Sequence, residues 1–198
     1  PDYELSLWIG GDIKDPISRS TLLQDCIKQF TKVDILINNA GRGHYEAWEK
    51  TSLEDIKELF QVNFISMIAI TQLFIPELIK TKGTVVNISS IAGNIAVPCM
   101  GLYCSTKYAV NAFSDSLRIE LKPRGVKVLN MIVGRINTGF STHALGQIKP
   151  PSTPGAGRPE ILAEKLYNAC MKEKKEIIYP AWYIFFIIFV KLFPWIYE

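Results

Sequence analysis

The chain has 198 residues, of which 48% are hydrophobic and 21% are charged, and its formal net charge is +3. These values fit a globular domain and argue against a disordered chain, and a charge this small does not predict a nucleic-acid partner. The four cysteines are widely spaced, which predicts reduced thiols and neither a disulfide frame nor a zinc site. His44 and His143 have no metal-like neighbours in the sequence, so we expect no metal site.

The first third of the chain predicts two strands and a helix. The apolar run Leu5–Ile9 predicts a short strand that leads into Gly10–Asp15. The stripe of apolar residues in Ser18–Phe30 predicts an amphipathic helix. The run Val33–Ile37 is rich in β-branched residues and does not alternate, which is typical of a strand buried on both faces of a parallel sheet. It continues into Asn38–Gly41, where the final glycine lets the backbone turn closely over a ligand.

A long helical pattern follows, and it contains an unusual asparagine. Thr51–Glu54 resembles a capping box, and the apolar pattern continues from there to Ile79, with room for a bend. Asn63 falls in the middle of this helix, where asparagine is a mediocre helix former. Taken alone, the residue is explained as well by a buried amide that bonds its own backbone as by a functional role.

The pair Tyr103 and Lys107 is the strongest chemical signal in the sequence. The two residues are four positions apart, so on the helix predicted to run from Tyr103 to Leu121 they share one face. A neighbouring ammonium favours the phenolate, so we expect Lys107 to lower the pKa of Tyr103, as an acid/base tyrosine requires. Ser90 ends the predicted strand Gly83–Ser90 and is placed to hold a substrate oxygen near the phenol. An exposed Tyr and Lys on an ordinary helix would explain the pair equally well if it stood alone.

It does not stand alone, because Ser90 lies thirteen positions before Tyr103, with Asn38–Gly41 and Asn63 upstream. Together these residues resemble the short-chain dehydrogenase/reductase family from about Asp12 to Glu176. The resemblance implies an oxidoreductase that transfers a hydride between NAD or NADP and a carbonyl or alcohol. It also implies that Ser90, Tyr103 and Lys107 are catalytic and that Asn63 supports Lys107 through a water molecule.

The same resemblance implies a set of cofactor-binding residues. Val126–Val133 predicts a further strand, and the segment after it keeps most of the family pattern Pro-Gly-x-Val-x-Thr, although Val133 replaces the proline. In this comparison Tyr103 and Lys107 contact the cofactor as well. The remaining cofactor-binding residues that the resemblance implies are Asp12, Ile13, Asn39, Ala40, Gly41, Gly134, Ile136 and Thr138. Asn39 is also expected to tie neighbouring strands together.

The last part of the chain contains a long loop and an apolar tail. Residues 140–159 lack periodicity, which favours a functional loop, and in the resembled family this is the substrate loop. A helix over Arg158–Lys175 and a strand over Glu176–Pro180 complete a domain of residues 1–180. The tail, residues 181–198, is apolar but too short to span a bilayer. It suits a segment lying at a membrane surface, or equally a dimer contact or a lid over the substrate.

No Gly-x-x-x-Gly-x-Gly motif follows an opening strand, so the glycine-rich pyrophosphate site is absent from the sequence. We therefore expect an α/β fold: a Rossmann-type, doubly wound parallel sheet that lacks its first two strands, with helices on both faces. The expected function is an NAD(P)-dependent reductase acting on a lipophilic carbonyl or alcohol. We also expect a homo-oligomer, most simply a homodimer, that is cytoplasmic or faces the cytoplasm at a membrane. The alternative is a non-catalytic remnant of such a reductase that binds a membrane or a partner.

Overall fold

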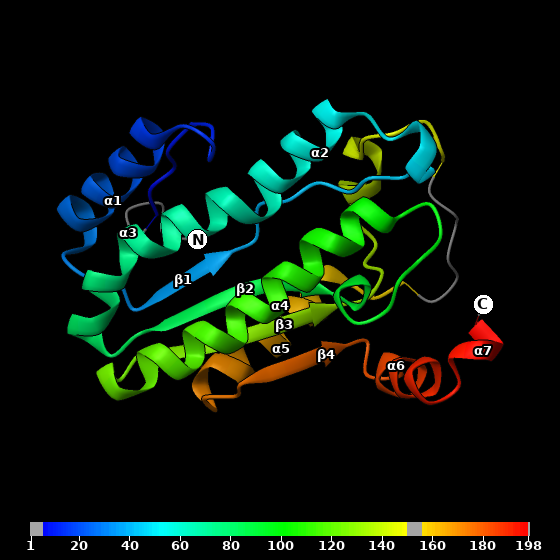
Figure 1. The fold of residues 1–198 in the computed structure, drawn as a ribbon. Coiled ribbons are helices and arrows are strands. Elements are labelled where there is room, and N and C mark those ends of the chain that lie inside the picture. Colours follow the sequence, from blue (N-terminus) through cyan, green and yellow to red (C-terminus); the bar gives the residue numbers. More distant parts are fainter. Residues whose placement is uncertain (1–5, 150–155, 198) are drawn as a thin grey trace.

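The computed structural model describes residues 6–149 and 156–197, with only the backbone at residue 197. A single parallel sheet, in the order β1-β2-β3-β4, forms its centre (Figure 1). The strands are β1 Ile35–Asn38, β2 Thr84–Ser90, β3 Lys127–Val133 and β4 Glu176–Tyr179. The longer helices are α1 Pro16–Phe30, α2 Leu53–Phe60, α3 Ser66–Thr81, α4 Gly101–Leu121, α5 Pro159–Met171, α6 Tyr183–Leu192 and α7 Pro194–Tyr197.

Shorter helical turns connect several of these elements. A π-helical turn, η3 Gln61–Ile65, joins α2 to α3, so the two helices form one run with the bend that the sequence predicted. The remaining turns are of the 3-10 type: η2 Trp48–Lys50, η4 Ile91–Gly93, η5 Lys122–Arg124 and η6 Gly139–His143.

Helices cover both faces of the sheet, as predicted. On one face α1, α3 and α4 pack over the strands, with Phe74, Leu117 and Val85 among the buried residues of that core. On the other face α5 packs through Ala169 and Cys170 against a second core that includes Leu129 and Met131. Because both faces of β2 and β3 are covered, six of the seven residues in each strand are buried, polar side chains included.

The outer strand β1 is not buried on both faces, and that prediction is wrong. Leu36 points into the first core and is 8% exposed, whereas its neighbours Ile35 and Ile37 are 38% and 48% exposed. Side chains alternate between the two faces of a strand, so both isoleucines lie on the face that α5 covers elsewhere. That helix packs against β3 and β4, at the other end of the sheet, so it leaves the outward face of β1 open.

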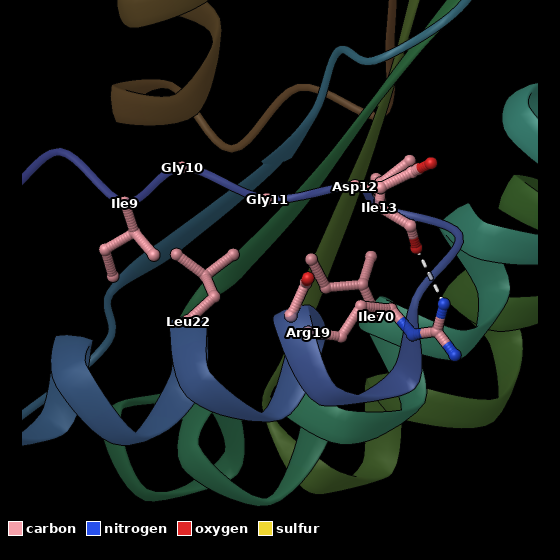
Figure 2. A pocket seen from close by; sticks show the side chains of 9 residues that line it. Ile9, Gly10, Gly11, Asp12, Ile13, Arg19, Leu22 and Ile70 are labelled. Atoms are coloured by element: carbon pink, nitrogen blue, oxygen red, sulfur yellow. Dashed lines mark hydrogen bonds between the residues drawn. The ribbon is translucent and has the colours of Figure 1, made fainter.

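The predicted strand Leu5–Ile9 is also absent from the residues that the structure describes, since residues 6–11 form no strand pairing. A strand needs a neighbour for its backbone N–H and C=O groups, and β1 pairs only with β2. Residues 9–13 lie instead over α1, where Ile9 and Leu22 line a pocket together with Ile70 of α3 (Figure 2).

Several helix ends differ from the predicted ones by a few residues. α1 begins at Pro16, two residues before the predicted start, because Asp15 caps it by accepting hydrogen bonds from the backbone of Ile17 and Ser18. The cap of α2 is Ser52, not Thr51, because the Ser52 hydroxyl accepts from the amide of Asp55. In addition, α5 stops at Met171, well before the predicted end, because the chain turns through a left-handed residue, Glu173, to enter β4.

The segment after β3 is more ordered than predicted over the residues described. Thr138 caps the 3-10 turn η6, and residues 144–148 run alongside residues 43–46. Residues 150–155 of the predicted loop lie outside the described residues. The expectation of a structureless segment is therefore wrong for its first part.

The apolar tail forms α6 and α7. Tyr183, Ile187 and Val190 lie on one face of α6 and are buried, packing towards Ile95. α6 has ten residues, about 15 Å, which is half the thickness of the hydrocarbon core of a bilayer. By length and composition the run Leu53–Thr81 could cross a membrane, but its inner face forms part of the core described above.

Candidate active site

The carboxyl ends of β1, β2 and β3 bring the predicted catalytic segments to one edge of the sheet (Figure 1). Ser90 is the last residue of β2 and lies opposite Val133, the last residue of β3. Parallel sheets of this kind bind ligands at that edge, where the loops leave the strands. The sequence therefore placed its candidate residues at the edge where such folds carry out their chemistry.

Ser90 and its neighbour Ser89 point in opposite directions, as an extended strand requires. The Ser90 hydroxyl accepts from the amide of Ala92, and it acts on the Tyr103 phenol by lowering the pKa of that group. The Ser89 hydroxyl donates to Asn111 Oδ1 of α4 at 2.5 Å. Only Ser90 therefore faces the phenol.

Tyr103 lies in the first turn of α4 and is 6% exposed. Burial raises the pKa of its phenol well above the ordinary value, and the Ser90 hydroxyl opposes that shift only in part. The prediction that the pKa of Tyr103 is lowered is therefore wrong for this structure. At neutral pH the phenol is protonated and is ready to donate.

Lys107 does not lower the pKa of Tyr103, and the position of its amino group explains why. Its Nζ donates to the carbonyl oxygen of Ile88 at 2.8 Å and is 5.8 Å from the centre of the Tyr103 ring. The amino group thus lies beside the ring face and is bonded to the strand. Burial also lowers the pKa of Lys107 to about 8, since the interior disfavours the ammonium.

Asn63 occupies the π-helical turn and connects three segments around the same point. Its Oδ1 accepts from the amide of Arg42 at 2.8 Å, and its Nδ2 donates to the Arg42 carbonyl at 2.9 Å. Nδ2 also donates to the Thr106 hydroxyl, one residue before Lys107. The amide is thus satisfied by other elements and not by its own helix turn, and π turns are frequent at functional sites.

Gly41 completes this corner of the site. A Cβ at this position would lie 3.3 Å from Asn63 Oδ1 and 3.9 Å from Lys107 Nζ. The glycine therefore leaves open the space between the end of β1 and the lysine. Asn63, Ser90, Tyr103, Lys107 and Gly41 are brought together as the sequence predicted.

The asparagine that ties the strands together is Asn38, not Asn39. Asn38 is buried, and its Nδ2 donates to Asn87 Oδ1 of β2 at 2.8 Å and to the Thr71 hydroxyl of α3 at 2.9 Å. Asn39 and Ala40 are exposed at the end of β1, next to Gly41. Alternation along the strand explains the difference, because two adjacent asparagines must point to opposite faces.

Asp12 and Ile13 lie beyond β1, at the pocket against α1 (Figure 2). The Asp12 carboxylate accepts from the amide of Lys14, whose Nζ is 3.0 Å from Glu58. Glu58 also lies 3.6 Å from Arg42, the residue after Gly41. Glu58 therefore links the Asp12 turn to the segment after β1, a role that no sequence pattern announces.

Gly134, Ile136 and Thr138 follow the end of β3. Gly134 has no room for a side chain, because a Cβ there would run into the ring of Tyr183. Ile136 is half-buried and pairs with Gly157, while Thr138 is exposed and caps η6. The tail helix α6 thus packs directly on the predicted cofactor loop.

The aromatic surroundings of Tyr103 were missed by sequence reasoning. The ring of Phe140 lies 6.0 Å from the Tyr103 ring, and Leu145 packs on the cluster that contains Tyr103. Tyr45 is 7% exposed, and it adds to the rise in the pKa of Tyr103. These residues come from the segments after β1 and β3, so only the folded chain brings them to the site.

Comparison with known proteins agrees with this geometry. A family model described as short chain dehydrogenase matches residues 4–147. The chain therefore belongs to the short-chain dehydrogenase/reductase family.

Among its relatives is the dehydrogenase/reductase SDR family member 7B of Rattus norvegicus, 30% identical over 84% of this chain and 54% of the relative. The mitochondrial D-beta-hydroxybutyrate dehydrogenase of the same organism is 48% identical over 47% of this chain and 27% of the relative. A short-chain dehydrogenase/reductase from Burkholderia phymatum, solved in complex with NAD, shares the fold with a TM-score of 0.83. It is 20% identical, over 94% of this chain and 75% of that chain.

The chain thus spans about half the length of the curated relatives it matches. Its four parallel strands fit a doubly wound sheet from which strands are missing on the β1 side.

Proposed function

We propose that this chain carries the catalytic part of an NAD(P)-dependent oxidoreductase that interconverts a carbonyl and an alcohol. The observation that carries the proposal is the burial of Ser90, Tyr103 and Lys107 together at the carboxyl edge of the sheet. Lys107 Nζ donates to the Ile88 carbonyl of the strand that ends at Ser90 and lies 5.8 Å from the centre of the Tyr103 ring. That arrangement favours an enzyme over a non-catalytic remnant.

Each residue has a separate role in the reductive direction. The Ser90 hydroxyl holds the carbonyl oxygen, and the Tyr103 phenol donates its proton to that oxygen. The Tyr103 phenol is protonated at neutral pH, but its raised pKa makes it a weak acid. The Lys107 ammonium, 5.8 Å from the ring centre, would stabilise the phenolate as the proton leaves. Asn63 fixes the turn after β1 against the helix that carries both groups.

The residues present fit the nicotinamide end of a dinucleotide. Gly41 leaves an opening beside Lys107, and the exposed Asn39 and Ala40 border it. We propose that these residues, with Gly134, Ile136 and Thr138, hold NAD or NADP, and that Asp12 and Ile13 hold its adenine end. When bound, the cofactor supplies or accepts the hydride.

The test is Tyr103→Phe in a catalytically competent form of the protein, followed by absorbance of the reduced dinucleotide. Losing the proton donor should lower kcat by at least about a hundredfold, while dinucleotide affinity stays within about twofold. Tyr108→Phe is the matched control, because Tyr108 lies on the same helix and is 45% exposed. Retention of kcat within a few-fold of wild type in Tyr103→Phe would rule out the assigned role.

We further propose a lipophilic substrate and contact with a membrane surface. Phe140 and Leu145 give the site an apolar wall. The outward face of α6 and α7 is also apolar, with Phe185, Trp195 and Leu192 exposed by 77%, 68% and 61%. Aromatic side chains flanking a short apolar helix suit the interface between water and lipid.

The membrane proposal is tested by changing the exposed face of α6 and α7 alone. Deleting the tail would uncover Ile95 and the other residues against which α6 packs, so substitution is the cleaner experiment. Phe185→Ser with Trp195→Ser should reduce sedimentation with liposomes by about tenfold or more, since each large apolar side chain contributes about 1.5–3 kcal/mol when fully buried. Ile119→Ser, on the exposed side of α4, is the control. Unchanged sedimentation of the double variant would contradict membrane contact.

A homo-oligomer in the cytoplasm, or at a membrane surface facing it, completes the proposal. All four cysteines are free, including the exposed Cys99, which suits a reducing compartment. Tyr108 and Ile119 expose apolar surface on α4 that a second copy could cover. Sedimentation velocity of wild type and of a Tyr108→Lys variant measures whether α4 contributes to assembly.

A further inference from the structure

Two segments about a hundred residues apart run side by side next to Tyr103. Residues 43–46 follow β1, and residues 144–148 belong to the segment after β3 (Figure 1, cyan and yellow). The amide of Tyr45 donates to the Leu145 carbonyl at 2.9 Å, and the Leu145 amide donates to the Gly43 carbonyl at 2.9 Å. The Ile148 amide then donates to the Tyr45 carbonyl at 3.1 Å. The two segments are thus paired like short parallel strands.

Glu46 closes this pairing with its side chain. The carboxylate is buried: Glu46 is 7% exposed, its Oε1 accepts from the Ala47 amide and its Oε2 accepts from the Gln147 amide, each at 3.0 Å. The Glu46 amide itself donates to the Cys99 carbonyl at 2.8 Å, so the residue is also fixed to the loop before α4. A carboxylate is rarely buried without such donors, because burial disfavours its charge.

Two glycines allow the close approach. Gly146 has a positive φ of 88°, and a Cβ there would run into the carbonyl oxygen of Tyr45. A Cβ on Gly43 would lie 3.2 Å both from Ala144 Cβ and from Phe140 Cε1. Both contacts are between the two segments, so the pairing depends on having no side chain at either position.

The chain after β3 also carries apolar side chains that lie beside Tyr103. Leu145 packs on the cluster of Tyr103, and Phe140 lies 6.0 Å from the Tyr103 ring. The paired position of residues 144–148 therefore determines where this apolar wall stands relative to the phenol.

We propose that Glu46 is a positioning residue that latches residues 144–148 over Tyr103 and so sets the wall that the substrate meets. The effect on the substrate rests on the proposed function, whereas the latch itself follows from the contacts of Glu46. Glu46 touches neither the phenol nor Ser90 in the contacts above; it acts through the Gln147 amide.

Hydrogen exchange on the chain as it stands tests the latch directly. In Glu46→Gln, one of the two accepting oxygens is replaced by an NH₂ group that faces an N–H donor. The Leu145, Gln147 and Ile148 amides should then exchange about tenfold faster, the change expected for one hydrogen bond to a charged group. Glu49→Gln makes the same chemical change on the exposed turn η2 and should leave these rates unchanged.

A second variant opens the latch without touching Glu46. Gly43→Ala pushes against Ala144 and Phe140 from the opposite side and should raise exchange at the same three amides. Both variants should raise KM for the carbonyl substrate by about tenfold, and dinucleotide affinity should stay within about twofold, because the latch contacts only the wall beside Tyr103.

The outcomes separate the latch from the proposed function. Unchanged exchange at Gln147 in a folded Glu46→Gln protein overturns the latch, whatever the activity. Faster exchange with unchanged KM shows a structural clip that does not set the substrate wall, and this also overturns the proposal. If the catalytically competent form of the wild type turns over no carbonyl or alcohol, the proposed function fails, and the exchange rates alone decide whether residues 144–148 are latched.

Discussion

The inner strand β2 and the outer strand β1 belong to one sheet, but helices cover both faces of β2 and only one face of β1. Val85 and Val86 point to opposite faces of β2 and both are 0% exposed, because helices cover both faces. On β1, Leu36 is buried while its neighbour Ile37 is 48% exposed. The proposed catalytic residues Ser90, Tyr103 and Lys107 lie on β2 or on α4, which packs against it, whereas Asn63 is bonded to Arg42 after β1.

The open side of β1 is where the sheet of a longer relative would continue. Ser90, Tyr103 and Lys107 need only β2, β3 and α4, all of which are fully packed. The pyrophosphate of a dinucleotide needs a glycine-rich turn at a helix N-terminus, and the sequence contains none that follows a strand. We therefore expect proton transfer by Tyr103 and capture of the pyrophosphate to depend on different parts of the fold.

The largest expected effect concerns dinucleotide binding. We expect this 198-residue chain to bind NADH or NADPH weakly, with Kd above about 100 μM, since the open side supplies no pyrophosphate contacts. Calorimetry on the chain, compared with a form extended at the amino end that carries the glycine motif, measures the difference. A low-micromolar Kd for the chain alone would show that β1 to β3 suffice for capture.

The next effect compares two neighbouring residues of β1. Leu36→Ala should lower the free energy of unfolding by about 2–5 kcal/mol, since it leaves a cavity in the core. Ile37→Ala should cost less than about 1 kcal/mol, because its side chain is already 48% exposed. Chemical denaturation of both variants checks this. A large cost for Ile37→Ala would mean that something covers the outward face of β1 in solution, such as a second copy.

The third effect is the pH dependence of stability caused by Lys107. Its pKa is about 8 in the folded chain against 10.5 ordinarily, so between these values the unfolded chain binds more protons. The free energy of unfolding of wild type relative to Lys107→Met should therefore rise with pH from about 8 to 10.5, by about 1.4 kcal/mol per pH unit at most.

Denaturation curves at several pH values measure that difference. Lys122→Met, at the exposed end of the same helix, is the control. A difference between wild type and Lys107→Met that stays constant from pH 7 to 11 would contradict the burial of the ammonium.

Local patterns in the sequence were enough to predict most of the elements. The run Val126–Val133 was recognised as a strand, and the four-residue step from Tyr103 to Lys107 placed both residues on one helix. These features are local: strand alternation and helix periodicity fix which residues share a face, whatever surrounds them. The resemblance to the short-chain dehydrogenase/reductase family added the proposed roles of these residues. The family match confirms membership of that family.

Only the tertiary structure decided which neighbours those residues meet. It gave the strand-tying role to Asn38 instead of Asn39, and it raised the pKa of Tyr103 where the spacing alone predicted a lower one. It also left Ile35 and Ile37 exposed and brought Glu46 to the Gln147 amide. The physical reason is common to all of these: burial, pKa and long-range hydrogen bonds depend on segments far apart in the chain, and a local pattern cannot report what packs against it.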